Sequence, residues 1–200
     1  MEEYIQINLG HLLEEKGENG TNSILSTFSC PVNKDIEDFL KNKAISFSNM
    51  GFAKTHLVFL KKDAELDLVG YFAIANKPLE IKGSALSQTM RKKIKNHGAF
   101  DPITKRYVVP AILIAQFGKN FNDGNQKQIR GDELMHLTLE KVKSVQSDVG
   151  SRFAYVECEN KSKLINFYER HGFVKFGERE TDRKSESSNR TLVQLLKYIR

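Results

Sequence analysis

The stretch Tyr107–Phe173 decides the fold of this chain. It reads YVVPAILIAQFGKN, the loop FNDGNQKQIRG, then DELMHLTLEKVKSV, and after five further residues SRFAYVECEN and KSKLINFYERHGF. The apolar runs and the helical spacings predict a strand, a glycine-containing loop, a helix, a second strand and a second helix. Strands that alternate with helices in this way indicate a mixed α/β sheet flanked by helices.

Both helix starts in this stretch carry signals. The loop sequence QIRG stands directly before the first helix, where a chain presents backbone N–H groups to an anion. The second helix follows Asn160, a good N-cap residue, and stops at Gly172, a residue suited to the C′ position. Its apolar residues Leu164, Phe167 and Tyr168 fall on one face, so we expect that face to be buried.

The composition indicates a globular protein of one domain. The chain has 200 residues, of which 40% are hydrophobic and 28% charged. No apolar run approaches the roughly 18 residues that span a bilayer, and the start shows no secretory signal. The only cysteines, Cys30 and Cys158, lie far apart in the sequence, which favours reduced thiols in a cytoplasm. No Cys/His cluster has metal-ligand spacing, so no metal is expected.

The chain is basic, with a formal net charge of +6. A basic chain attracts polyanions such as nucleotides, CoA or RNA, although a modest positive charge is also common without a polyanionic partner. Residues 84–100 predict a short helix with Arg91, Lys92, Lys93 and Lys95 around its outside. These cations are either a solvated face or a wall that contacts phosphate beside an active site.

The flanking segments predict further elements. Tyr4–Ile7 alternates like a strand, residues 17–22 form a turn-rich break, and a helix begins near Asn33 or Asp35. Residues 56–60 and 68–75 predict a hairpin in which Gly70 marks a bulge or a close backbone approach. The run 107–117 predicts a central strand buried on both faces. Because Pro110 has no backbone N–H, either no neighbouring strand pairs with it at that point or the strand bends there. Residues 177–190 predict a polar loop before a final strand, 191–199.

The central stretch resembles the GNAT superfamily of N-acetyltransferases. The family's phosphate loop reads Q/R-x-x-G-x-G/A, and the run Gln128-Ile129-Arg130-Gly131-Asp132-Glu133 matches its first four positions but has Glu133 in place of a small residue. The family also carries an asparagine after a strand and a helix reading FYxxxGF, which Asn160 and Phe167–Phe173 match. More loosely, residues 28–75 are similar to the acetyltransferase toxins of bacterial toxin–antitoxin pairs.

The resemblance implies a GNAT-like central mixed sheet with splayed strands. It implies one acetyltransferase-like domain over residues 1–200, with 1–27 an N-terminal extension and 76–106 an insertion. It also implies that acetyl-CoA is the cosubstrate. The residues that would bind acetyl-CoA are Phe117, Gly118, Lys119, Gln128, Ile129, Arg130, Gly131, Asp132, Glu133 and Asn160.

Tyr168 is the catalytic residue that the resemblance implies, as the acid that protonates the departing thiolate. A phenol has an ordinary pKa near 10 and can donate a proton at neutral pH, but a tyrosine on a buried helix face can also be structural. Glu157 is a weak candidate for the base, and a structural carboxylate is the stronger interpretation. Cys158 is expected to be a buried thiol, and His136 with Glu140 a surface pair.

Three functions remain open at this point. The first is acetyl-CoA-dependent transfer of an acetyl group to a primary amine of an unidentified acceptor. The second makes that acceptor the amino group of aminoacyl-tRNA, in a toxin with an antitoxin protein as partner. The third is a non-catalytic CoA-binding or regulatory module, which Glu133 in the phosphate loop favours. A homodimer is left open, and no membrane association is expected.

Overall fold

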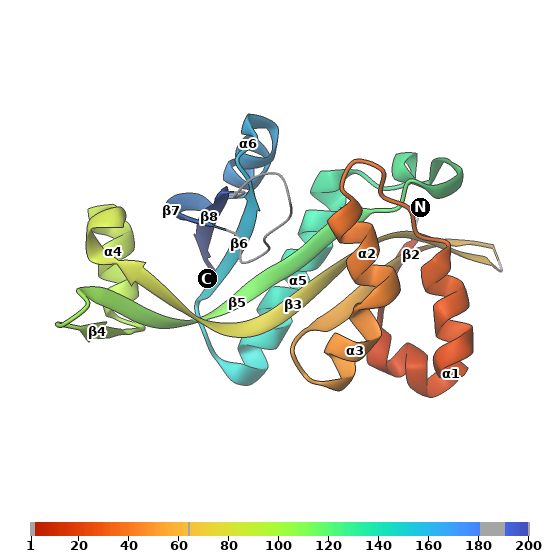
Figure 1. Ribbon diagram of the computed structural model, residues 1–200, viewed down its shortest axis with the longest axis horizontal. Helices are drawn as coiled ribbons and strands as arrows, with labels where there is room; N and C mark the ends of the chain where they lie inside the picture. Colours follow the sequence, from red (N-terminus) through yellow and green to blue (C-terminus); the bar gives the residue numbers. More distant parts are fainter. Residues whose placement is uncertain (1–2, 64, 181–190, 200) are drawn as a thin grey trace. The chain divides into compact units, whose positions relative to one another are not determined.

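The computed structural model describes residues 3–63, 65–180 and 191–199 (Figure 1). The strands are β1 (Glu3–Asn8), β2 (Lys54–Lys62), β3 (Glu65–Lys82), β4 (Ala99–Asp101), β5 (Arg106–Lys119), β6 (Phe153–Glu159), β7 (Val174–Glu180) and β8 (Thr191–Tyr198). The helices are α1 (Leu9–Ser26), α2 (Lys34–Asn42), α3 (Ala44–Asn49), α4 (Gln88–Lys95), α5 (Gly131–Val149) and α6 (Ser162–Arg170), with 3-10 turns η1 (Gly83–Ala85) and η2 (Asn122–Lys127).

The strands form a mixed sheet in the order β1-β2-β3-β5-β6-β8-β7, with β4 paired to β5. The expected mixed α/β class is therefore confirmed. The chain divides into two compact units, which are Met1–Ala75 with Ala115–Lys141 (unit 1) and Asn76–Ile114 with Val142–Arg200 (unit 2). Within the described ranges, no helix is both long enough and apolar enough to cross a bilayer.

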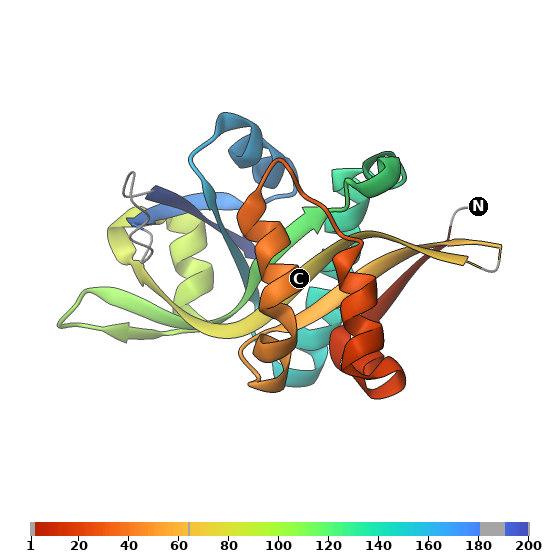
Figure 2. The ribbon, with the colours of Figure 1, turned by 45° about the vertical axis from the view of Figure 1, so that its right-hand side comes forward.

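Unit 1 is built on the antiparallel strands β1, β2 and β3. Helices α1, α2 and α3 lie on one face of these strands (Figure 2). Adjacent residues of β3 point to opposite faces, as a strand requires. Tyr71 packs among Phe28 and Phe39 below α2, whereas an added Cβ on Gly70 would meet Leu134 of α5. The predicted strand near Tyr4 and the predicted hairpin are both present.

Gly70 is the close backbone approach that the sequence predicts. The register of β2 and β3 shifts between Val58 and Phe59, because Val58 pairs with Gly70 and Phe59 with Leu68. A Cβ at Gly70 would lie 3.0 Å from the carbonyl oxygen of Gly118. A larger residue at position 70 would need the Gly118 carbonyl and the Leu134 side chain to give way by a few tenths of an ångström, which favours glycine there.

The helical segment of unit 1 differs from the prediction in detail. The predicted break at residues 17–22 appears as a kink at Gly17, whose φ of 67° is non-helical, and α1 resumes its helical conformation after it. Helix α2 begins where expected, because the Asn33 side chain accepts a hydrogen bond from the Asp35 backbone N–H at 3.0 Å. It ends earlier than expected, and α3 follows it as a separate short helix.

Unit 2 contains a short parallel ladder between β5 and β6. It comprises three pairs, which join Ile112, Leu113 and Ile114 to Ala154, Tyr155 and Val156. Both strands extend beyond the last pair, as expected for strands that splay apart. Strands β6, β8 and β7 then pair antiparallel. Phe153, Tyr155 and Leu196 are fully or almost fully buried in a core that also includes Ile94 of α4.

Two sequence-based predictions in this unit are wrong. The first half of β5 is not buried on both faces, because Pro110 is exposed and Val108 is 37% exposed. The Pro110 carbonyl accepts a hydrogen bond from the Ser151 hydroxyl at 2.9 Å. Asn160 is not the N-cap of the second motif helix, since α6 has Lys161 at that position and no side-chain cap. Residues 177–180 of the expected polar loop belong instead to β7, and its residues 181–190 lie outside the described residues.

Candidate active site

The segment that resembles the GNAT phosphate loop, Gln128 to Glu133, lies between the end of β5 and the first turn of α5 within unit 1, and it is called the phosphate loop below. Strand β5 ends at Lys119, η2 follows, and α5 begins at Gly131. Ile129 is 1% exposed and holds the loop against the core, whereas Arg130 is exposed. The first turn of α5 directs its N–H groups beyond the helix end, which is the geometry that binds anions.

Lys119 fixes the shape of this loop through its side chain. Its Nζ donates hydrogen bonds to the carbonyl oxygens of Gln126 at 2.6 Å and Ile129 at 3.0 Å. Burial lowers the pKa of Lys119, while the charge of Glu133 acts in the opposite direction. The sequence predicted only a backbone role for Lys119, so this cation beneath the loop is an additional feature.

Asn120 anchors the same loop and was not predicted as a site residue. Its side chain is 0% exposed. The Oδ1 atom accepts from the backbone N–H groups of Ser29 at 2.9 Å and Asn122 at 3.0 Å, and Nδ2 donates to the Leu68 carbonyl at 2.8 Å. The sequence does contain a signal for this role, which is an asparagine at the end of a long apolar strand. If such a side chain is buried, its amide must form several hydrogen bonds.

Glu133 caps the N-terminus of α5, the helix that follows the phosphate loop. Its Oε2 accepts a hydrogen bond from the Arg130 backbone N–H at 2.7 Å, and its Oε1 lies 3.4 Å from the Arg130 Nε. This is the carboxylate half of a capping box, with Arg130 as the residue before the helix and Glu133 as its third residue. The carboxylate therefore occupies a position where an anionic ligand would also bind.

Gln128 connects the loop to the N-terminal strand. Its backbone carbonyl accepts a hydrogen bond from the Tyr4 hydroxyl at 2.7 Å, and its Nε2 donates to Asn125 at 2.8 Å. Among the described residues, the buried Oε1 atoms of Gln126 and Gln128 have no hydrogen-bond partner. Buried acceptors of this kind usually contact water or a ligand.

Gly118 and Phe117 precede Lys119 on β5. A Cβ on Gly118 would lie 2.5 Å from Cγ2 of Ile36, so any other residue there would require the Ile36 side chain to move. Phe117 is partly buried. These residues form the end of β5, which is the position that the GNAT resemblance assigns to the pantetheine arm.

Tyr168 lies in unit 2 on the buried face of α6. It is 8% exposed, and its ring packs edge-on against Phe167 and Phe173 with centroid distances of 5.3 and 5.8 Å. Burial raises the pKa of the Tyr168 phenol, and Cys158 adds to the shift. Its hydroxyl has no hydrogen-bond partner among the described residues. Gly172, with a φ of 80°, ends the motif as predicted.

Two other polar residues of β6 have structural environments. Burial raises the pKa of Glu157, but hydrogen bonds from Arg179 and Gln194 at 2.8 Å outweigh it, and the net shift is downward. A carboxylate held by two donors is a poor base, which agrees with its structural interpretation. Burial raises the pKa of the Cys158 thiol to about 11, so it is largely protonated at neutral pH.

The structure assembles the unit 1 residues into one loop and helix end, and it places Tyr168 and Asn160 in unit 2. His136 and Glu140 are both exposed on α5. Over residues 3–63, 65–180 and 191–199, no three His, Cys, Asp or Glu side chains come close enough together to hold a metal ion.

Solved structures share this fold along most of the chain. AtaT complexed with acetyl-methionyl-tRNAfMet has a TM-score of 0.63 and 16% identity, covering 96% of this chain and 94% of AtaT. A tyrosine-to-phenylalanine mutant of KacT has a TM-score of 0.61 and 17% identity, covering 94% and 93%. AtaTR bound with acetyl-CoA has a TM-score of 0.57 and 15% identity, covering 96% and 91%.

These likenesses confirm the GNAT-like fold that the loop and the FYxxxGF helix predict. No protein-family model matches the chain, and no curated protein matches its sequence. The similarity therefore concerns the fold.

Proposed function

We propose that this protein is an acetyl-CoA-dependent N-acetyltransferase that transfers the acetyl group to a primary amine. The observation that carries the proposal is the fold, shared along nearly the whole chain with AtaT, a protein solved with an acetylated aminoacyl-tRNA. The phosphate loop before α5 and the buried tyrosine of α6 support it.

The loop residues fit a CoA diphosphate with one conflict. The first turn of α5 offers backbone N–H groups, and Arg130 adds an exposed cation. The conflict is Glu133, whose carboxylate must leave the Arg130 N–H before a phosphate oxygen can take its place. The backbone of Phe117, Gly118 and Lys119 would hold the pantetheine arm, and Asn160 is the further cofactor-binding residue that the GNAT resemblance implies.

Acetyl-CoA, when bound, supplies the acetyl thioester. The chain must polarise the thioester carbonyl, and the backbone N–H groups at the end of β5 near Phe117 would do so. Tyr168 would hold a proton at its Oη, since a phenol is protonated at neutral pH, and would donate it to the departing sulfur. The acceptor amine loses one proton to solvent, which balances the proton that Tyr168 gives.

The chain supplies no strong base in this proposal, since Glu157 is held by Arg179 and Gln194. An amine of low pKa needs none, because a substantial fraction is already neutral at pH 7. The α-amino group of an amino-acid ester has such a low pKa. This requirement favours an aminoacyl ester as the acceptor.

We therefore propose aminoacyl-tRNA as the acceptor class. The net charge of +6 suits a polyanionic partner, and AtaT is solved with acetyl-methionyl-tRNAfMet. An antitoxin protein would be the cognate partner, as for AtaT bound to the C-terminus of AtaR. Cys30 and Cys158 are both free and buried, which suits a cytoplasmic enzyme.

A second candidate function is a CoA-binding module without catalysis. The capping position of Glu133 favours it, because a carboxylate at the helix end opposes the diphosphate electrostatically. Under this alternative the protein binds CoA weakly and transfers no acetyl group.

Measurement of CoA release separates the two candidates. The purified protein is mixed with acetyl-CoA and with a panel of amines that includes several aminoacyl-tRNAs. We expect turnover with at least one aminoacyl-tRNA, and a kcat about 100- to 10,000-fold lower for Tyr168→Phe. Tyr155→Phe, another buried tyrosine of unit 2, is the matched control and retains activity.

Absence of turnover with every amine, despite measurable CoA binding, supports the non-catalytic module. Turnover with simple amines but not with aminoacyl-tRNA keeps the enzyme and rejects the acceptor class. Wild-type kcat in Tyr168→Phe rejects Tyr168 as the acid.

A further inference from the structure

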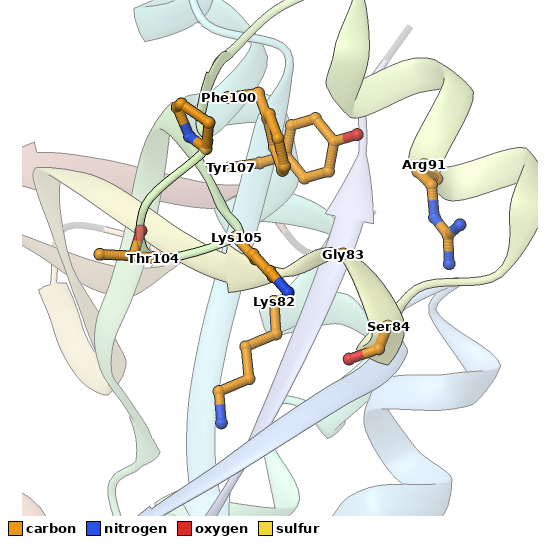
Figure 3. Close-up of a pocket in the computed structure, with 9 residues that line it drawn as sticks. Lys82, Gly83, Ser84, Arg91, Phe100, Thr104, Lys105 and Tyr107 are labelled. Atoms are coloured by element: carbon orange, nitrogen blue, oxygen red, sulfur yellow. The ribbon is translucent and has the colours of Figure 1, made fainter.

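A cavity of 580 Å³ opens in unit 2, outside the residues assigned to acetyl transfer. Its walls come from the end of β3, η1, α4 and the β4–β5 hairpin (Figure 3). The side chains that matter are Lys82, Ser84, Arg91, Phe100, Lys105 and Tyr107. This volume lies within the range of about 300–1,000 Å³ that small-molecule sites have.

The cations of this cavity are available to bind an anion. Within the part of the chain that the structure describes, no residue of its lining is acidic. Among the described residues, Lys82, Arg91 and Lys105 form no ion pair, whereas the neighbouring Arg106 lies 3.9 Å from Glu80. Three unpaired cations around one concave surface attract a phosphate.

Phe100 and Tyr107 provide an aromatic surface beside these charges. Their ring centroids are 4.9 Å apart, and Figure 3 shows the two rings together above Lys105. Tyr107 is 7% exposed and belongs to the core, but Phe100 is 50% exposed. A half-exposed phenyl ring next to cations is suited to stacking on a nucleobase whose phosphate the cations bind.

The hairpin that carries Phe100 and Lys105 is held in shape by its own hydrogen bonds. The carboxylate of Asp101 accepts from the Ile103 backbone N–H at 2.8 Å and from the Thr104 hydroxyl at 2.7 Å. Asp101 thus faces the turn. Lys105 has a φ of 54°, and its carbonyl accepts from the Gly83 N–H at 3.5 Å. The cavity is therefore formed before any ligand arrives.

We propose that this cavity binds one unpaired nucleotide of the RNA acceptor, with the base against Phe100 and the phosphate between Lys82, Arg91 and Lys105. The proposal rests on the proposed function for the choice of RNA, but its chemistry is that of any nucleotide. A base stacked inside a duplex cannot present its face to Phe100, so an unpaired stretch of RNA is the ligand and the interior of a duplex is not.

The test is the affinity of the full-length protein for a short fluorescent single-stranded RNA, measured by anisotropy at several salt concentrations. Loss of one stacked base weakens binding by about 5- to 150-fold, and we expect this range for Phe100→Ala. Phe100→Tyr keeps the aromatic face and should bind like the wild type. Ile103→Ala is the matched apolar control, because Ile103 is 90% exposed on the same hairpin but does not line the cavity.

The charge variants are Lys82→Gln and Lys105→Gln, with Lys92→Gln as the matched control on the exposed side of α4. Each lost phosphate contact lowers the slope of log K against log salt by about 0.7 for a single strand. We expect that change for the two lining lysines and not for Lys92. Equal effects of all three variants would reveal a diffuse basic surface and overturn the proposal.

Two competitors identify the source of the nucleotide. Unlabelled single-stranded RNA should displace the probe, whereas a blunt RNA duplex of the same sequence should not. If AMP or CoA displaces the probe at lower concentration than RNA and Phe100→Ala abolishes this, the cavity is a free-nucleotide site and the RNA assignment is rejected.

The RNA-binding test of the cavity and the acetyl-transfer test of the proposed function can fail independently. Wild-type RNA affinity in Phe100→Ala rejects the cavity even if aminoacyl-tRNA is acetylated. Weakened RNA binding in Phe100→Ala supports the cavity even if the acceptor of the acetyl group proves to be another amine.

Discussion

Replacement of Glu133 by alanine should lower the stability of the protein and raise its affinity for acetyl-CoA. In the structure the Glu133 carboxylate takes the Arg130 backbone N–H at 2.7 Å and lies 3.4 Å from the Arg130 Nε. Both groups are ones that a diphosphate would use. Since the carboxylate must be displaced before the diphosphate binds, its removal lowers the free energy of the bound state relative to the free state.

The magnitude follows from the two contacts that are lost. A capping interaction at a helix N-terminus contributes about 1 kcal/mol. The Arg130 and Glu133 side chains are 76% and 36% exposed, so their ion pair adds at most about 1 kcal/mol. We therefore expect the free energy of unfolding of Glu133→Ala to be about 1 kcal/mol lower than that of the wild type. We expect it to bind acetyl-CoA roughly 5- to 30-fold more tightly, because 1.4 kcal/mol is a factor of ten.

Calorimetric titration with acetyl-CoA and urea unfolding of the same preparations measure the two effects. Glu133→Gln separates charge from capping, since glutamine can still accept from the Arg130 N–H but carries no charge, and its effects should be intermediate. Unchanged or weaker acetyl-CoA binding in Glu133→Ala, with stability lowered as expected, would show that the carboxylate does not compete with the ligand.

Three further predictions concern stability. Burial lowers the pKa of His56 to about 4, so its contribution to stability is present above the unfolded pKa of about 6.5 and is lost as the pH falls. We expect the free energy of unfolding to fall by about 2 kcal/mol between pH 7 and pH 5, and His56→Gln to lack this loss in urea titrations at both pH values. Asn120→Ala should lower that free energy by about 3 kcal/mol, since it leaves the backbone N–H groups of Ser29 and Asn122 without their acceptor and removes the shorter of two hydrogen bonds to the Leu68 carbonyl; a loss below about 1 kcal/mol would mean that water replaces the amide. Gly70→Ala should lower the thermal unfolding midpoint, because the new Cβ would lie 3.0 Å from the Gly118 carbonyl oxygen, and overpacking of this kind destabilises by about 1–3 kcal/mol.

The central motifs could be predicted because they depend on local geometry. The loop Gln128–Gly131 precedes a helix, and the FYxxxGF helix places Tyr168 on its buried face, since both features follow from helical periodicity and terminal residues. The bulge at Gly70 could also be read from a glycine within an apolar strand.

The contacts that bridge distant segments could not be predicted. Asn120 reaches Ser29, 91 positions away in the sequence, and no local pattern indicates that partner. The cap of α6 was misplaced by one residue, because Asn160 is a better capping residue than Lys161 on propensity alone. Glu133 was recognised as a departure from the family's loop, but only the structure shows that it bonds to Arg130.

The bond between Tyr4 and the Gln128 carbonyl joins the first strand of the chain to the loop assigned to CoA, 124 positions away in the sequence. Strand β1 therefore helps to hold the loop of the proposed cosubstrate site in place. An affinity tag, a fusion partner or a binding protein that displaced β1 would loosen that loop, so a purification tag belongs at the other end of the chain.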